Sequence, residues 1–183
     1  MCPREQLLYA RCEIDDMVFV LGTTERGLCL VSLPYEQTAE PLHEKMVALY
    51  SSFEVRPSEA AIEVYYGELK EYFAAQRRTF TFALDLRGTP FQVSVWKALM
   101  SVSYGDVCSY GDIARRIDNP RAVRAVGAAT GRNPVPIVVP CHRILGKNGT
   151  LTGYRGGLAY KQRLLRLEGV DHYTPSGHAR FAF

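Results

Sequence analysis

This 183-residue sequence lacks long apolar runs, internal repeats and low-complexity segments. No apolar stretch approaches the ~20 residues that a membrane-spanning helix needs, so we expect no membrane partner. Residues 1–6 do not place a basic region before an apolar one, and we therefore expect no signal peptide. Apolar residues make up 47% of the chain and charged residues 22%, which is the balance of a globular protein.

Cysteines are few: five, at positions 2, 12, 29, 108 and 141, with no C-x-x-C spacing. This pattern argues against a disulfide framework and against a zinc knuckle. A reducing compartment would keep these residues as thiols, so we expect a cytoplasmic protein, or a nuclear one in a eukaryote. Cys12 and Cys29 fall inside strand patterns and are interpreted as small buried residues. A zinc site that combines Cys2 with these two and His43 is the alternative, although the spacing does not require it.

Charges are distributed unevenly, although the net charge is only +3. Residues 1–85 hold 8 Lys and Arg against 14 Asp and Glu, a net charge of −6. Residues 86–183 hold 14 against 5, a net charge of +9. A basic half of this kind is typical of proteins that bind a polyanion, so nucleic acid is one candidate partner; a solvated basic surface is the other interpretation.

The N-terminal half reads as a small α/β domain with no catalytic motif. Three β-prone runs separated by turn residues predict a meander over residues 7–12, 17–21 and 28–33. We expect one helix over residues 40–53 and a second, capped by Ser58, with an apolar stripe from Ile62 to Phe73. Residues 79–86 read as a further strand, and residues 86–90 mark the domain boundary.

The C-terminal half contains two helix starts that the sequence marks clearly. Thr89 can cap a helix with Pro90 at its first position, and Trp96 is expected in the core. Ser109 can cap a short helix over residues 110–117, followed by a turn at 118–120 and a second helix over 121–130. Arg121 and Arg124 would then project from that second helix one turn apart. In outline this is a two-helix DNA-binding unit.

Cys141 stands between Pro140 and His142, after an apolar run, 136–139, that we interpret as a buried strand. A glycine-rich loop, 146–157, and an amphipathic helix that ends near Glu168 follow it. The thiolate form of cysteine is the nucleophile, and His142 could remove the thiol proton through a water if a carboxylate such as Glu168 orients it. By itself, a Cys-His pair fits a buried thiol beside a core histidine equally well.

Several spaced motifs resemble the O6-alkylguanine-DNA alkyltransferases, from Thr89 to about Gly169. The central one is Pro140-Cys141-His142-Arg143, preceded by the run from Gly131 to Val139. The others are Phe91, Val95-Trp96-Lys97, Tyr104-Gly105, Ser109-Tyr110, Asn119-Pro120, Arg124-Ala125-Val126-Gly127, Leu151-Thr152-Gly153-Tyr154, Gly156-Gly157-Leu158 and Leu167-Glu168-Gly169.

The resemblance implies roles for individual residues. Cys141 is the implied alkyl acceptor, His142 the base acting through water, and Glu168 the residue that orients it. Tyr110 would help to turn the nucleotide out and donate to guanine N3, while Arg124 would fill the gap left in the base stack. The remaining implied DNA contacts and pocket residues are Asn119, Arg121, Lys147, Asn133, Ile144, Tyr154 and Arg155.

The resemblance also implies a whole-chain organisation. Residues 1–86 would form a ribonuclease-H-like α/β structural domain, residues 87–170 a mainly α domain with a helix-turn-helix, and residues 171–183 a tail. The implied activity is single-turnover repair of O6-alkylguanine, and of O4-alkylthymine, by a monomer that binds double-stranded DNA through the minor groove. No cofactor and no metal are implied. A helix-turn-helix regulator and a Cys-His hydrolase are the alternatives from other classes.

Overall fold

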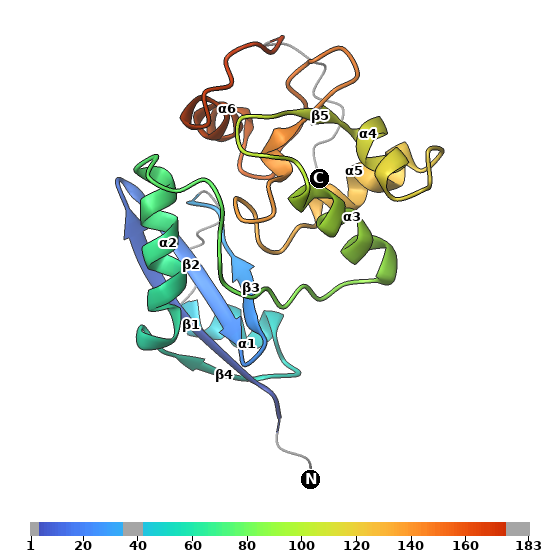
Figure 1. Ribbon diagram of the computed structural model, residues 1–183. Coiled ribbons are helices and arrows are strands. Elements are labelled where there is room, and N and C mark those ends of the chain that lie inside the picture. The colour runs from blue at the N-terminus through green and yellow to red at the C-terminus, as the bar shows by residue number, and fades with distance from the viewer. Residues whose placement is uncertain (1–3, 35–41, 175–183) are drawn as a thin grey trace. The chain divides into compact units, whose positions relative to one another are not determined.

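The computed structural model describes residues 4–34 and 42–174 (Figure 1). The chain divides into two compact units at the Leu86–Arg87 peptide bond. Within the described ranges, no helix is long and apolar enough to cross a membrane.

The first unit is built on a four-stranded mixed sheet with strand order β3-β2-β1-β4. Its antiparallel strands are β1 (Gln6–Ile14), β2 (Met17–Thr24) and β3 (Gly27–Val31), which confirm the predicted meander. Strand β4 (Glu54–Pro57) then pairs in parallel with the first residues of β1. Strand β4 was not predicted, because its four residues end in proline and are too few to show an alternating pattern.

Two helices pack on opposite faces of this sheet (Figure 1). Helix α1 (Leu42–Leu49) buries Met46 against the face that includes Val20. The 3-10 turn η2 (Ala60–Ile62) leads into α2 (Glu63–Phe73), whose Phe73 ring lies 5.6 Å from the ring of Phe19. Neighbouring residues of a strand point to opposite faces, so α2 lies on the other side of the sheet from α1. The predicted Ser58 cap of α2 is wrong: the Ser58 hydroxyl accepts from the Ala61 amide of η2 at 3.3 Å, and the N-cap position of α2 is Ile62.

The predicted strand over residues 79–86 is wrong. Only Leu84 pairs with the sheet, in an isolated bridge to Leu28. Side chains tether the segment instead: the Thr81 amide donates to Glu68 Oε2 at 2.8 Å, and the Thr24 hydroxyl donates to Asp85 Oδ2 at 2.7 Å. Its alternating apolar residues are explained by Phe80 and Phe82, whose rings pack against tyrosines of α2.

The second unit is mainly helical. Its helices are α3 (Pro90–Met100), α4 (Tyr110–Arg116), α5 (Val123–Gly131) and α6 (Leu158–Leu167), and its short parallel strands are β5 (Cys108–Ser109) and β6 (Ile144–Leu145). Both predicted caps are present: Thr89 and Ser109 form capping boxes with Gln92 and Asp112. Trp96 is buried as expected, and its indole N–H donates to the Ala129 carbonyl at 2.9 Å, which ties α3 to α5.

Helix α5 begins two residues later than the sequence suggested. Arg121 therefore lies in the turn before the helix. The prediction that it shares a helix with Arg124 is wrong. The turn is tight because Asp118 adopts a positive φ of 55° and the Asn119 amide donates back to the Ala114 carbonyl of α4. Asp and Asn tolerate this left-handed conformation better than most residues.

Residues 136–139 are buried as predicted, but they form a turn instead of a strand. Ile137 has φ 77°, and an isolated bridge joins Pro136 to Val139. A β-branched residue is strained at such a φ, and this backbone reversal cannot be read from an apolar run. Cys141 then opens a 3-10 turn, η3 (Cys141–Arg143).

Candidate active site

The side chain of Asn133 closes the turn that delivers Cys141. Its Oδ1 accepts from the Val135 amide at 3.0 Å, and its Nδ2 donates to the Val139 carbonyl at 2.8 Å. The same Nδ2 donates to Cys141 Sγ at 3.1 Å. Pro140, at φ −82° and ψ 62°, adds an inverse γ-turn in which the Cys141 amide bonds the Val139 carbonyl at 2.8 Å. The thiol is therefore fixed in position by the loop that carries it.

Cys141 is 7% exposed, and its environment has opposing effects on the pKa of the thiol. Burial raises the pKa of Cys141, while the Asn133 hydrogen bond, the charges of Arg155 and Lys161 and a hydrogen bond from Tyr154 act to lower it. Burial dominates, so the thiol form is favoured in the absence of DNA. A base is then required to generate the nucleophile.

The structure brings His142 together with Glu168, as the sequence analysis proposed. His142 Nε2 lies 2.8 Å from Glu168 Oε1, and both side chains are fully buried. Burial lowers the pKa of His142, with the neighbouring carboxylate opposing the shift, so the imidazole is neutral at physiological pH. With Nε2 occupied by Glu168, Nδ1 is the ring nitrogen that remains to accept a proton.

Arg143 completes this cluster, and the sequence analysis assigned it no role. Its Nε donates to Glu168 Oε2 at 2.8 Å and its Nη2 to Oε1 at 2.9 Å, a bidentate pair. The guanidinium also donates to the Val102 carbonyl and lies over the Tyr104 ring. Burial by itself would raise the pKa of Glu168, but the hydrogen bonds from His142 and Arg143 outweigh it and the pKa falls well below its usual range. Glu168 is therefore a permanent carboxylate.

Lys161 is a second site residue that sequence reasoning missed. It is fully buried on α6, and its amine donates to the Ile144 and Thr152 carbonyls. Burial lowers its pKa to about 8, an effect that the nearby Cys141 opposes. The only available signal was a lysine on the apolar face of an amphipathic helix.

Other predicted pocket residues surround the same loop. The Tyr110 hydroxyl, at the start of α4, lies 3.3 Å from Thr152 Oγ1, and burial raises its pKa. Tyr154 is half-buried, with its ring 6.4 Å from that of Tyr160, whereas Arg155 beside it is exposed. Ile144 is fully buried, and its carbonyl binds Lys161.

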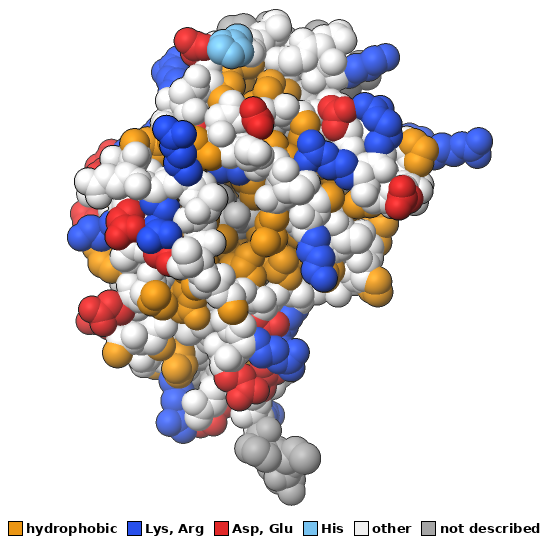
Figure 2. All heavy atoms as spheres, viewed as in Figure 1, with side chains coloured by type: hydrophobic (Ala, Val, Ile, Leu, Met, Phe, Trp, Pro, Cys, Tyr) orange, Lys and Arg blue, Asp and Glu red, His pale blue; other side chains and the backbone are white. Residues whose placement is uncertain are grey.

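The predicted DNA contacts lie on the surface of the second unit. Arg124 is exposed on α5, while Asn119 and Arg121 are exposed in the turn before it. Lys147 is exposed in the loop after β6. Several Lys and Arg side chains gather over the α4–α5 end of this unit (Figure 2), which suits a polyanion.

A metal site has little support among the described residues. Cys2, one of the four ligands of the alternative zinc site, lies outside them. Within residues 4–34 and 42–174, no group of three or more His, Cys, Asp or Glu side chains could hold a metal ion. Cys12 and Cys29 are buried in the sheet, as small core residues are.

Comparison with known proteins places this site in a family. Residues 90–170 match the family model described as 6-O-methylguanine DNA methyltransferase, DNA binding domain. The inducible methylated-DNA–protein-cysteine methyltransferase of Bacillus subtilis is 44% identical over 162 residues, which cover 88% of this chain and 90% of that protein. The chain belongs to the methylated-DNA–protein-cysteine methyltransferase family.

Solved structures of the family share the fold of both units. The O6-methylguanine methyltransferase of Mycobacterium tuberculosis in complex with DNA is 40% identical, with a TM-score of 0.76 over 88% of this chain and 93% of that one. The O6-methylguanine-DNA methyltransferase of Pyrococcus kodakaraensis is 29% identical, with a TM-score of 0.62 over 90% and 100%. The two-domain architecture, a mixed sheet with helices followed by a helical unit, is therefore that of the family.

Proposed function

We propose that this protein repairs alkylated DNA by transferring the alkyl group from O6 of guanine to Cys141, once per molecule. The observation that carries the proposal is the fixed Cys141 thiol beside the buried His142–Glu168 pair, 2.8 Å apart, in the unit that matches the family's DNA-binding domain. The names of the relatives, as methyltransferases acting on methylated DNA, support the same activity.

The chemistry balances as a single displacement. His142 takes the thiol proton through a bridging water, and the Cys141 thiolate attacks the alkyl carbon. A carbon–sulfur bond forms as the bond from that carbon to O6 breaks, and guanine leaves with the electron pair. Guanine therefore leaves as an anion, and the Tyr110 hydroxyl donates a hydrogen bond to its N3, where negative charge develops. The thioether product has no good leaving group, so the protein is consumed.

DNA binding is assigned to α4, α5 and the turn between them, as a helix-turn-helix. We place α5 in the minor groove because its residues at 125, 127, 128 and 129 are small and that groove is narrow. Arg124 fills the stack after the target nucleotide is turned out, a step that costs a few kcal/mol. Asn119, Arg121 and Lys147 contact the backbone, and Asn133, Ile144, Tyr154 and Arg155 shape the pocket.

The remaining assignments concern the whole chain. The order of the first sheet, with one parallel strand added to an antiparallel meander, supports a ribonuclease-H-like domain over residues 1–86. The protein acts as a monomer without cofactor or metal, on O4-alkylthymine as well as O6-alkylguanine. It works in the cytoplasm, or in the nucleus of a eukaryote.

The test is incubation with a duplex that carries O6-[methyl-labelled]guanine, followed by peptide mass spectrometry. We expect about one label per protein, on Cys141, since the thioether cannot turn over. Cys141→Ser should abolish transfer, and Cys108→Ser, the matched control, should leave it intact. Repeated turnover would indicate a hydrolase, and sequence-specific binding of undamaged DNA that survives Cys141→Ser without any transfer would indicate a regulator.

A further inference from the structure

One edge of β1 is only half covered. Strand β4 pairs with β1 from Gln6 to Tyr9, and the Ser58 amide makes a last bond to the Tyr9 carbonyl at 2.8 Å. The chain then leaves the sheet into η2. Among the described residues, no strand continues β4 along the rest of β1, so the edge from residue 10 to residue 14 has no strand neighbour on that side.

The polar groups of this edge point outward from the sheet. Carbonyls of odd-numbered residues face the β4 side, as those of Glu5 and Tyr9 show by accepting from Glu54 and Ser58. Because the direction alternates along a strand, the N–H and C=O of Arg11 and those of Glu13 face the same side. The Tyr66 hydroxyl donates to the Glu13 carbonyl at 2.8 Å, which confirms this direction.

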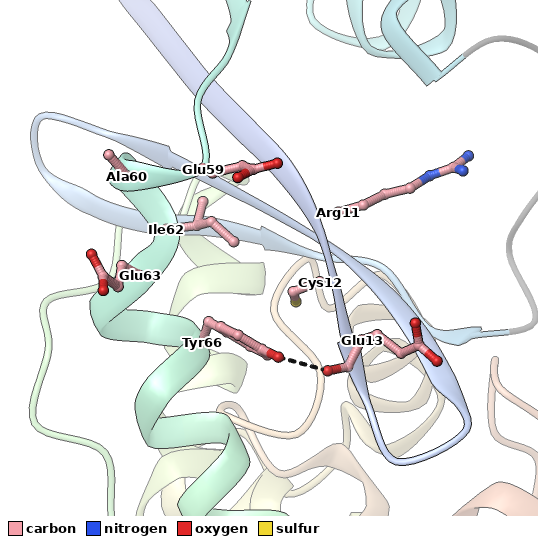
Figure 3. A pocket seen from close by; sticks show the side chains of 8 residues that line it. All are labelled: Arg11, Cys12, Glu13, Glu59, Ala60, Ile62, Glu63 and Tyr66. Carbon is pink, nitrogen blue, oxygen red and sulfur yellow. Dashed lines mark hydrogen bonds between the residues drawn. The ribbon is translucent and has the colours of Figure 1, made fainter.

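A groove runs along this edge, between β1 and the start of α2 (Figure 3). Its volume is about 530 Å³, and its lining residues are Arg11, Cys12, Glu13, Glu59, Ala60, Ile62, Glu63 and Tyr66. Cys12 and Ile62 are buried and give it an apolar floor, while the half-buried Tyr66 ring forms one wall. The open edge spans about 16 Å at ~3.3 Å per residue, the length of a typical strand.

The charge of the groove is negative. Glu59 points across it toward β1 and the exposed Glu63 lies on the first turn of α2, whereas the side chains of Arg11 and Glu13 both project from β1 away from α2 (Figure 3). The unit around it carries the −6 net charge of residues 1–85. An extended ligand with Lys or Arg side chains would match this potential.

We propose that the β1 edge from residue 10 to residue 14, with η2 and the start of α2, is a docking groove for an extended, basic segment of a partner protein. The segment would add as a strand beside β1, bonding the Arg11 backbone, as in other strand-addition interfaces. Its basic side chains would lie near Glu59 and Glu63. The residues of the groove belong to the first unit and those of alkyl transfer to the second, so the proposal does not depend on that activity.

The probe is an acetylated, amidated hexapeptide of alternating Lys and Val, titrated into the full chain while backbone amide shifts are recorded by NMR. We expect the shifts to concentrate at Arg11, Glu13 and the start of α2. A peptide with alternate nitrogens methylated should bind at least about tenfold more weakly, because it loses the strand donors on one edge. A Glu-Val hexapeptide should bind more weakly still.

Charge reversals test the assignment of Glu59 and Glu63 as the groups that attract a basic ligand. Glu59→Lys with Glu63→Lys should weaken the Lys-Val peptide about tenfold or more, whereas Glu44→Lys, exposed on α1, should change it by less than about twofold. Alkyl transfer should be unchanged in both variants. Equal binding of the methylated peptide, dispersed shifts, no binding, or self-association through this edge would each overturn the proposal.

Discussion

Arg143 sets the charge state of the catalytic pair at the scale of single residues. Glu168 accepts from His142 and twice from Arg143, and Gly105 adds a backbone amide at 3.3 Å. A carboxylate with so many donors is held ionised and has little tendency to accept a proton from His142. Glu168 orients the imidazole and stabilises the imidazolium, which must therefore carry the proton itself.

This arrangement predicts opposite pH shifts for two substitutions. The Arg143 charge lowers the pKa of His142 and the Glu168 charge raises it. Since transfer needs neutral His142, Arg143→Met should move the acidic limb of the single-turnover rate to higher pH, and Glu168→Gln should move it to lower pH and slow the reaction. DNA affinity should change little in either variant. Arg143→Lys keeps the charge and should leave the limb in place.

Breaking this buried pair costs about 3–5 kcal/mol, so thermal unfolding of each variant has to be measured beside its rate profile. Shifts in the same direction for Arg143→Met and Glu168→Gln would reduce Arg143 to a packing role. A shift of the acidic limb of the rate profile in Arg143→Lys would lead to the same conclusion.

Residues of the site differ in how far the sequence could reveal them. Cys141 and His142 are adjacent in a recognisable motif, and Glu168 is the only acid from residue 156 to residue 170. The roles of Lys161 and Arg143 follow only from contacts that the fold creates. Lys161 binds the Ile144 carbonyl, 17 residues away in the sequence, and Arg143 binds Glu168, 25 residues away. Basic residues are mostly exposed, so no local pattern marks a buried one as part of a site.

At the scale of elements, Arg121 and Arg124 now stand in different local structures. Arg124 lies in the first turn of α5, and Arg121 lies in the preceding turn. Both are exposed and equally charged, so the loss of either as a phosphate contact should lower the salt dependence of DNA binding by about one unit of slope. Only a residue that replaces a flipped base should also stabilise the extruded nucleotide.

We therefore expect Arg124→Ala to slow transfer from duplex DNA at least about tenfold more than Arg121→Ala, which corresponds to about 1.4 kcal/mol in the barrier. On free O6-alkylguanine, which needs no flipping, the two variants should match the parent. Single-turnover rates on both substrates measure this. Equal losses on duplex, or an Arg124→Ala defect that persists on the free base, would make Arg124 an ordinary contact.

Elements with local signals were predictable, and those made by distant contacts were not. The caps of α3 and α4 depend on residues three positions apart, and both were found. Strand β4 exists because β1, some 48 residues earlier, offers it a parallel edge from Gln6 to Tyr9. The apolar segments 79–86 and 136–139 were expected as strands, but aromatic packing in the first and the Asn133-closed turn in the second determine their conformation.

At the scale of the whole molecule, the two halves of the chain differ in net charge and in the functions assigned to them. The +9 half contains every residue assigned to alkyl transfer and DNA binding, whereas the −6 half presents the groove beside β1. A negatively charged unit would be repelled by the DNA that the other unit binds. This separation leaves the first unit available for a partner other than DNA, since its groove is complementary to basic segments.

Alkylation should also alter the stability of the whole protein. The Cys141 sulfur is almost fully buried and accepts from Asn133 at 3.1 Å, so an added alkyl group must displace a neighbour or occupy the space that the target base leaves. Forcing extra carbon into a packed site costs typically about 1–3 kcal/mol. We therefore expect the methylated protein to melt a few degrees below the thiol form, and the benzylated protein lower still, in thermal unfolding followed by circular dichroism.

Cys141→Ser treated with the same alkyl donors serves as the control and should melt at one temperature throughout. The dependence of the melting temperature on the size of the alkyl group distinguishes two causes. Overpacking increases with the volume of the group, whereas loss of the Asn133 hydrogen bond is the same for every alkyl group. Equal shifts for methyl and benzyl would assign the destabilisation to Asn133 alone. Unchanged or raised melting temperatures would show that the emptied base pocket accommodates the group, and that the spent protein is as stable as the active one.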